Sequence, residues 1–165
     1  ITQHLPDEPL YAQFDTRLIS QALTNLIKNA VEAIEAVGVE TIDDPQIIVE
    51  ARIEGEEAVV SVSDNGKGWP AENRHTLLEP YMTTRDKGTG LGLAIVAKII
   101  EQHGGRVDLR DAEPDRNGRV GACFAFTLPL HETGKQSQEL LLPARDPSPQ
   151  TEREEASRTD AMAYK

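Results

Sequence analysis

The sequence predicts an α/β two-layer sandwich, in which a mixed, largely antiparallel sheet is covered by helices on one face. Three observations predict this fold class. Apolar residues recur with a helical period in two segments and alternate in several others. The segments follow the order strand, helix, two strands, long loop, helix, two strands. The chain has 165 residues, 38% of them hydrophobic, which is enough for one sizeable core.

The first predicted elements are a short strand over residues 10–14 and a long helix that runs to about Val37. Asp15 is a favourable N-cap residue, and Gly38 is expected to end the helix. The apolar residues of this helix are three and four positions apart, as one buried face requires. They are Leu18, Ala22, Leu23, Leu26, Ile27, Ala30 and Ile34.

A β-hairpin is predicted next, with strands over residues 46–53 and 58–63. Residues 65–92 are rich in Gly, Pro, Thr and charged side chains, which predicts a long loop with one short helical stretch near 72–78. Loops of this length in compact domains are usually functional or disordered.

The last predicted elements are a helix over residues 91–103, which Gly104 and Gly105 end, and two strands over 106–110 and 120–128. Residues 1–130 are therefore expected to form one domain. Residues 131–165 are rich in Ser, Pro, Glu, Gln and Arg and have few large apolar side chains, so a disordered tail is predicted.

The composition limits the partners of this chain. Its formal net charge of -11 at pH 7 disfavours nucleic acids and anionic membranes. A phosphate site would have to rely on backbone amides, a few placed cations and Mg²⁺. The single cysteine, Cys123, cannot form an internal disulfide and is expected to be a buried, inert thiol. The chain as given is expected to be soluble, and its start at Ile1 without Met suggests a piece of a longer protein.

Two asparagines in the first helix, Asn25 and Asn29, lie four residues apart and share one face at the edge of the apolar stripe. Asn costs about 0.5 kcal/mol of helix propensity relative to Ala, and a half-buried amide needs partners. Alone, the pair would be interpreted as a surface feature or a hydrogen bond to the sheet.

A carboxylate ends the second hairpin strand at Asp64, and Gly66 and Gly68 follow it. A carboxylate in this place can accept hydrogen bonds from an exocyclic amine, which would select adenine over guanine. Asp-Asn-Gly is also ordinary turn chemistry, and this is the simpler interpretation of the run in isolation.

Three alternating glycines, in the run from Gly88 to Gly92, precede the second helix, where unpaired amides and the helix dipole favour phosphate. A dinucleotide-binding fingerprint would need a strand directly before it and a glycine in place of Leu93. The GxxxxGK[ST] run of P-loop enzymes is absent from the sequence.

Together these motifs resemble those of the histidine kinases. Residues 25–30 resemble the N box, 64–68 the first glycine box, 78–84 the F box and 88–92 the second glycine box. The residues of the N box and the F box are most similar to those of nitrogen-regulation sensor kinases of the NtrY and NtrB kind. The resemblance implies a Bergerat-type fold that binds ATP with Mg²⁺.

The resemblance also implies roles for single residues. Asn29 would ligate Mg²⁺, with Asn25 assisting and Lys28 near the phosphates, whereas Asp64 would bind adenine. Gly66 and Gly68 would let the chain pass close to the base. The remaining contacts to the nucleotide would come from Thr84, Arg85, Lys87, Gly88, Thr89, Gly90, Leu91 and Gly92. Two residues depart from the common pattern: Leu78 stands where Phe is common, and Glu32 where many kinases carry Lys.

The residue types favour phosphoryl transfer over hydrolysis. Related ATPases of the gyrase B, mismatch-repair and heat-shock chaperone kinds place a Glu general base where this chain has Asn25. An amide cannot accept a proton from water at neutral pH. Transfer to a histidine depends mainly on positioning and charge neutralisation.

None of the four histidines stands in the setting of the family's phosphoacceptor helix; they are His4, His75, His103 and His131. The chain is therefore expected to bind Mg-ATP without labelling itself, as a monomeric fragment of a homodimeric kinase. The resemblance implies an upstream dimerisation domain with the acceptor histidine, a response regulator as partner, and a cytoplasmic location within a membrane-anchored kinase.

Two other functions remain open at this point. The same boxes occur in stand-alone serine kinases of the anti-sigma type. A non-enzymatic nucleotide sensor that signals by closing its lid would also carry them.

Overall fold

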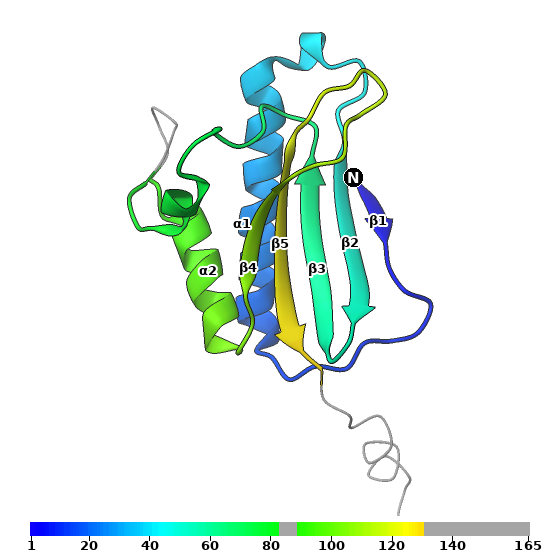
Figure 1. Cartoon of the computed structure of the whole chain (residues 1–165), viewed down its shortest axis with the longest axis vertical. Helices are drawn as coiled ribbons and strands as arrows, with labels where there is room; N and C mark the ends of the chain where they lie inside the picture. Colours follow the sequence, from blue (N-terminus) through cyan, green and yellow to red (C-terminus); the bar gives the residue numbers. More distant parts are fainter. Residues whose placement is uncertain (83–88, 131–165) are drawn as a thin grey trace, which may run out of the picture. The chain divides into compact units, whose positions relative to one another are not determined.

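A five-stranded sheet forms one layer of the computed structural model, which describes residues 1–82 and 89–130 (Figure 1). The strand order is β1-β2-β3-β5-β4. The pairing of β1 with β2 is parallel and the other three pairings are antiparallel, so the predicted mixed, largely antiparallel sheet is confirmed. The strands are β1 (Thr2–His4), β2 (Ile47–Glu54), β3 (Glu57–Asp64), β4 (Val107–Asp111) and β5 (Ala122–Pro129).

The second layer consists of helices α1 (Thr16–Val37) and α2 (Gly92–Gln102). The predicted cap of α1 is confirmed, because the Asp15 carboxylate accepts hydrogen bonds from the backbone N–H groups of Arg17 and Leu18 at 2.8 and 3.2 Å. The helix ends at Gly38, whose φ of 91° suits glycine. Two 3₁₀ helices complete the described elements: η1 (Val39–Thr41) and η2 (Arg74–Leu78).

One core joins the two layers. Alternate residues of the central strands, Val62 on β3 and Phe124 and Phe126 on β5, pack with the apolar faces of both helices. Both helices therefore cover the same face of the sheet, as predicted for an α/β two-layer sandwich. On α1 the buried residues are Ile19, Ala22, Leu26, Ala30, Ala33 and Ile34.

The predicted strand at residues 10–14 is wrong. The edge of the sheet next to β2 is occupied by β1, and the segment after β1 crosses beyond the ends of the strands to reach α1 (Figure 1). In this segment only Ala12 pairs, through an isolated bridge with Leu130.

The other predicted elements are confirmed to within a few residues: the hairpin, a short 3₁₀ turn near 72–78, the helix that ends before Gly104 and the last two strands. Cys123 is half-buried rather than buried, because its side chain alternates with those of Phe124 and the core. The proposed tail, 131–165, lies outside the described residues. Among the helices of the described ranges, none has the length and apolarity needed to cross a bilayer.

Candidate functional site

A cavity of about 580 Å³ opens between α1, the end of β3, the loop after β3 and the start of α2. This volume suits a small-molecule ligand. Residues from all of the predicted motifs line it. The lining comprises Leu26, Lys28, Asn29, Ala30, Glu32, Ala33, Glu35, Val62, Asp64, Lys67, Gly68, Trp69, Pro70, Leu77, Met82, Thr89, Gly90, Gly92, Leu93, Ala122 and Phe124.

The first helix and the glycine run meet at one side of this cavity. A Cβ atom added at Gly92, the first residue of α2, would lie 3.7 Å from Nδ2 and 3.9 Å from Oδ1 of Asn29. The amide of Asn29 therefore faces the N-terminal end of a helix, where backbone N–H groups favour an anion. Asn29 and Gly92 are 63 positions apart in the sequence, and together they form one wall of the cavity.

Asp64 lies at the other side of the cavity, at the end of β3, and is 8% exposed. Its Oδ1 accepts hydrogen bonds from the backbone N–H groups of Gly66 at 2.8 Å and Ala122 at 3.5 Å. Burial raises the pKa of this carboxyl group, and the two backbone hydrogen bonds oppose the rise. Both of these donors reach Oδ1, and Asp64 also lines the cavity.

Gly66 packs against the first helix. Its added Cβ would lie 2.5 Å from the backbone carbon and 2.6 Å from the backbone oxygen of Ala33 on α1. The next residue, Lys67, donates its backbone N–H to the same oxygen at 3.2 Å. Gly66 does not line the cavity. The loop thus needs glycine here in order to pack on α1, whereas Gly68 lines the cavity and has a φ of 70°.

The buried side chain of Asn65 fixes the neighbouring loops, and sequence reasoning missed it. Its Oδ1 accepts from the N–H of Gln46 at 2.8 Å, and its Nδ2 donates to the carbonyl of Asp44 at 2.8 Å and to the Asp115 carboxylate at 3.2 Å. These contacts hold the turn that places Asp64. The sequence shows this asparagine as part of an Asp-Asn-Gly turn, but a turn motif does not predict hydrogen-bond partners so far away in the chain.

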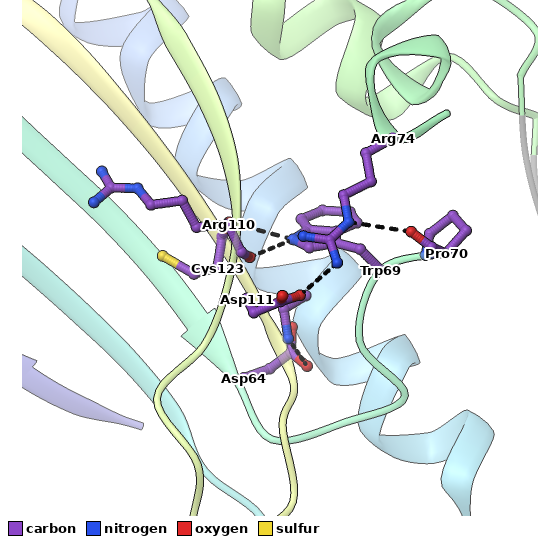
Figure 2. Close-up of polar contacts among 8 residues, drawn as sticks. Asp64, Trp69, Pro70, Arg74, Arg110, Asp111 and Cys123 are labelled. Atoms are coloured by element: carbon purple, nitrogen blue, oxygen red, sulfur yellow. Dashed lines mark hydrogen bonds and ion pairs between the residues drawn. The ribbon is translucent and has the colours of Figure 1, made fainter. Parts of the chain in front are cut away.

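The loop after β3, which forms part of the cavity wall, contains the single tryptophan of the chain. Sequence reasoning also missed this residue. Trp69 lines the cavity and packs against the core. Its indole N–H donates to the carbonyls of Arg110 at 2.7 Å and Cys123 at 3.3 Å (Figure 2).

The second glycine run is described only in part. Thr89, Gly90 and Gly92 line the cavity, and Leu91 is half-buried outside the lining. Gly90 has a φ of 65°, and its added Cβ would lie 2.5 Å from the carbonyl carbon of Tyr81, so only glycine fits. The predicted contacts Thr84, Arg85, Lys87 and Gly88 lie outside the described residues.

The structure also shows where Asn25 lies, and where Glu32 and Leu78, the two departures from the family pattern, lie. Asn25 is half-buried on α1 but does not line the cavity. Glu32 does line it, and its carboxylate lies 3.9 Å from the Lys28 ammonium group. Leu78 packs against the core. The side chain of Lys28 is 74% exposed, so this cation remains well hydrated.

The described histidines stand apart from the cavity lining. His4 and His75 are exposed. His103 at the end of α2 has both ring nitrogens in hydrogen bonds, Nε2 to the N–H of Asp15 at 2.9 Å and Nδ1 to the carbonyl of Ile99 at 2.7 Å. His131 lies beyond the described ranges.

The donor set of the cavity fits a metal ion that arrives with a phosphate ligand. Residues 1–82 and 89–130 contain no group of three or more His, Cys, Asp or Glu side chains that could hold a metal by themselves. The amide oxygen of Asn29 is a hard donor of the kind that Mg²⁺ accepts, and Mg²⁺ commonly shares its coordination between a few protein oxygens and substrate phosphates. The geometry therefore suits a ligand with an amine at one end and a charged phosphate group at the other.

Comparison with known proteins agrees with this geometry. Residues 14–132 match the family described as histidine kinase-, DNA gyrase B- and HSP90-like ATPase. The nitrogen regulation protein NtrY of Azorhizobium caulinodans is 56% identical over 117 residues, which are 71% of this chain and 15% of that protein. The sensory histidine kinase/phosphatase NtrB of Azospirillum brasilense is 37% identical over 137 residues, covering 78% of this chain and 32% of that protein.

A solved structure extends the likeness to three dimensions. The catalytic domain of the histidine kinase ThkA superposes with a TM-score of 0.63 at 32% identity, covering 78% of this chain and 76% of that one. The chain thus matches most of a catalytic domain, but it spans only 15% and 32% of the length of the two curated relatives.

Proposed function

Because the chain belongs to the histidine kinase-, DNA gyrase B- and HSP90-like ATPase family, we propose that it is the ATP-binding catalytic domain of a sensor histidine kinase. One observation carries the proposal. Asn29 and Gly92 meet at one side of a cavity whose other side is the buried carboxylate of Asp64. Among the relatives named above, NtrY is a nitrogen regulation protein and NtrB is a sensory histidine kinase/phosphatase, which supports the same assignment.

The base end of the site would recognise adenine. Oδ2 of Asp64 would accept a hydrogen bond from the exocyclic amine of adenine, whereas guanine would present a carbonyl oxygen in the same place and be repelled. Burial strengthens this discrimination, because an unpaired buried polar group costs free energy that water cannot recover.

The phosphate end would bind the triphosphate through Asn29 and the start of α2. Asn29 would hold Mg²⁺, which supplies neutralisation of the charge on the phosphates when it is bound. The backbone N–H groups after Gly90 and Gly92 would donate to phosphate oxygens, since the first turn of a helix leaves them unpaired. Lys28 would add a hydrated positive charge at the rim.

The chemistry proposed is transfer to an imidazole nitrogen rather than hydrolysis. The α1 position that related ATPases use for a general base is Asn25, which cannot take a proton from water and does not line the cavity. An imidazole brings its own lone pair, so the site needs to position the phosphate and stabilise charge.

The partners follow from this chemistry. The acceptor histidine would belong to a dimerisation domain upstream of Ile1, and a response-regulator aspartate would receive the phosphate afterwards. The chain would then be the cytoplasmic catalytic part of a membrane-anchored, homodimeric kinase. These assignments concern the whole kinase, of which this chain matches a part.

Phosphotransfer from γ-labelled ATP tests the proposal. The 165-residue chain alone should bind Mg-ATP and remain unlabelled, and mixing it with the upstream dimerisation domain should label a histidine of that domain. Stable labelling of this chain by itself, or labelling of a serine in a partner, would overturn the assignment to histidine transfer.

A further inference from the structure

One wall of the cavity belongs to a segment with little regular structure. Trp69, Pro70 and Leu77 line the cavity, and all three lie between β3 and α2, where η2 is the one helical element described. The position of such a segment depends on a few side-chain anchors rather than on a ladder of backbone hydrogen bonds.

Trp69 provides the first anchor of this wall. Its indole N–H reaches the carbonyls of Arg110 and Cys123, a residue pair of the β4–β5 ladder. The ring is thereby tied to the sheet edge while its other side contributes to the cavity. Figure 2 shows the indole between the strands and the loop.

Arg74 provides the second anchor, from outside the cavity lining. Its Nε donates to the carbonyl of Pro70 at 3.1 Å, and its Nη2 lies 2.8 Å from Oδ1 of Asp111 at the end of β4. One guanidinium group thus joins the loop to the same strand that holds Trp69 (Figure 2). The Arg74 side chain is only 30% exposed, which strengthens the contact relative to a fully hydrated pair.

We propose that Arg74 is a positioning residue for nucleotide binding: it holds Trp69 and Pro70 at the base end of the cavity by bridging the Pro70 carbonyl to Asp111. The inference rests on the proposed function and names a determinant of the same site. A planar guanidinium offers donors in two directions at once, whereas an ammonium group offers a point charge on a flexible stem. Lysine at position 74 donates from a single nitrogen and therefore cannot reproduce the two fixed donor positions of the guanidinium group.

The test uses the complete 165-residue chain with Arg74→Lys and Asp111→Asn. The matched control is Arg52→Lys, since Arg52 pairs with Glu54 at 2.7 Å on β2 and does not line the cavity. Calorimetry with ATP and with adenosine is run well below the melting temperature of each variant, so that lost stability alone leaves the dissociation constants unchanged.

The expected result is a loss of affinity by about threefold to fivefold for both ligands in Arg74→Lys and Asp111→Asn, the size of one partly exposed ion pair. The factor by which Mg²⁺ strengthens ATP binding should stay constant, because the wall serves the base end. The control should bind as the wild type does, and emission of the single tryptophan should shift in both test variants but not in the control.

Two results would overturn the inference while leaving the proposed function intact: wild-type affinities in both variants, or a loss shared by Arg52→Lys. If Arg74→Lys does not fold, Asp111→Asn decides, since it keeps a hydrogen-bond acceptor and removes only the charge. If the wild-type chain binds no nucleotide, the proposed function itself is wrong.

Discussion

The two ends of the cavity are built in different ways. At the base end, Asp64 and Asn65 are buried and bonded to backbone groups of several segments, so their positions are set before any ligand arrives. At the phosphate end, a Cβ added at Gly92 would only just reach the amide of Asn29, and Lys28 is largely exposed. In the proposed function, recognition of the base would therefore be preorganised, whereas binding of the phosphates would depend on ions and on the ligand.

Removing the amide of Asn29 should have the largest effect on ligand affinity, and only at the phosphate end. In Asn29→Ala, affinity for Mg-ATP should fall at least about 100-fold, the equivalent of about 2.7 kcal/mol, because Mg²⁺ loses its protein ligand. Adenosine, which carries no phosphate, should bind as before. Calorimetry with both ligands measures the two ends separately. An equal loss for adenosine would mean that Asn29 acts on the base end as well.

A methyl group at Gly66 should weaken the base end of the cavity because it destabilises the fold. Gly66→Ala places a Cβ 2.5 Å from the backbone of α1 and should lower the free energy of unfolding by about 2–3 kcal/mol. Urea denaturation measures this. Gly55→Ala is the control, since its Cβ meets nothing within 4 Å and only its φ of 63° opposes the change, at about 1 kcal/mol. Equal losses in the two variants would contradict the packing of Gly66 on α1.

Replacing the carboxylate of Asp64 should separate function from stability. In Asp64→Asn the affinity for ATP should fall about tenfold, one lost charge-assisted hydrogen bond, while the melting temperature at neutral pH rises by a few degrees. Asparagine keeps the oxygen that accepts from Gly66 and Ala122 without the cost of a buried charge. A melting temperature below that of the wild type would contradict this account.

The gain in stability from Asp64→Asn should depend on pH. Because the folded-state pKa of Asp64 is raised above 3.8, the folded state binds the proton more tightly than the unfolded state does. The stabilisation from this proton is present below pH 3.8 and is lost as pH rises through the folded-state pKa. The gain in stability from Asp64→Asn should therefore be larger at pH 7 than at acidic pH.

The smallest effect is expected at Asn25. It shares a face of α1 with Asn29 but does not line the cavity, so Asn25→Ala should change affinity for Mg-ATP by less than about twofold. Calorimetry beside Asn29→Ala provides the comparison. A loss as large as that of Asn29→Ala would show that the two amides act as a pair, as the family resemblance implies.

Local chemistry made much of this fold predictable. Asp15 and Gly38 mark the ends of α1 because capping is decided within one turn of the helix. Alternation between polar and apolar residues gave the hairpin, and the motifs gave Asn29, Asp64 and Gly92, which the structure brings to one cavity.

Long-range pairing set the limit of sequence reasoning. β1 has three residues and pairs in parallel with β2, a distant partner that the local pattern of residues does not identify. The bridge from Arg74 to Asp111 and the anchors of Asn65 join segments that no periodicity relates. The packing of Gly66 was not foreseen for the same reason, since its neighbour Ala33 lies 33 positions earlier, on a helix.

Calorimetric titration of the folded wild-type chain with Mg-ATP and Mg-GTP would decide whether the cavity is an adenine-nucleotide site. The account predicts saturable binding of Mg-ATP at one site, weaker binding of Mg-GTP, and a loss of affinity for ATP when Mg²⁺ is chelated. A well-folded chain that gives no binding heat with Mg-ATP at two temperatures, or that binds both nucleotides equally, would contradict it.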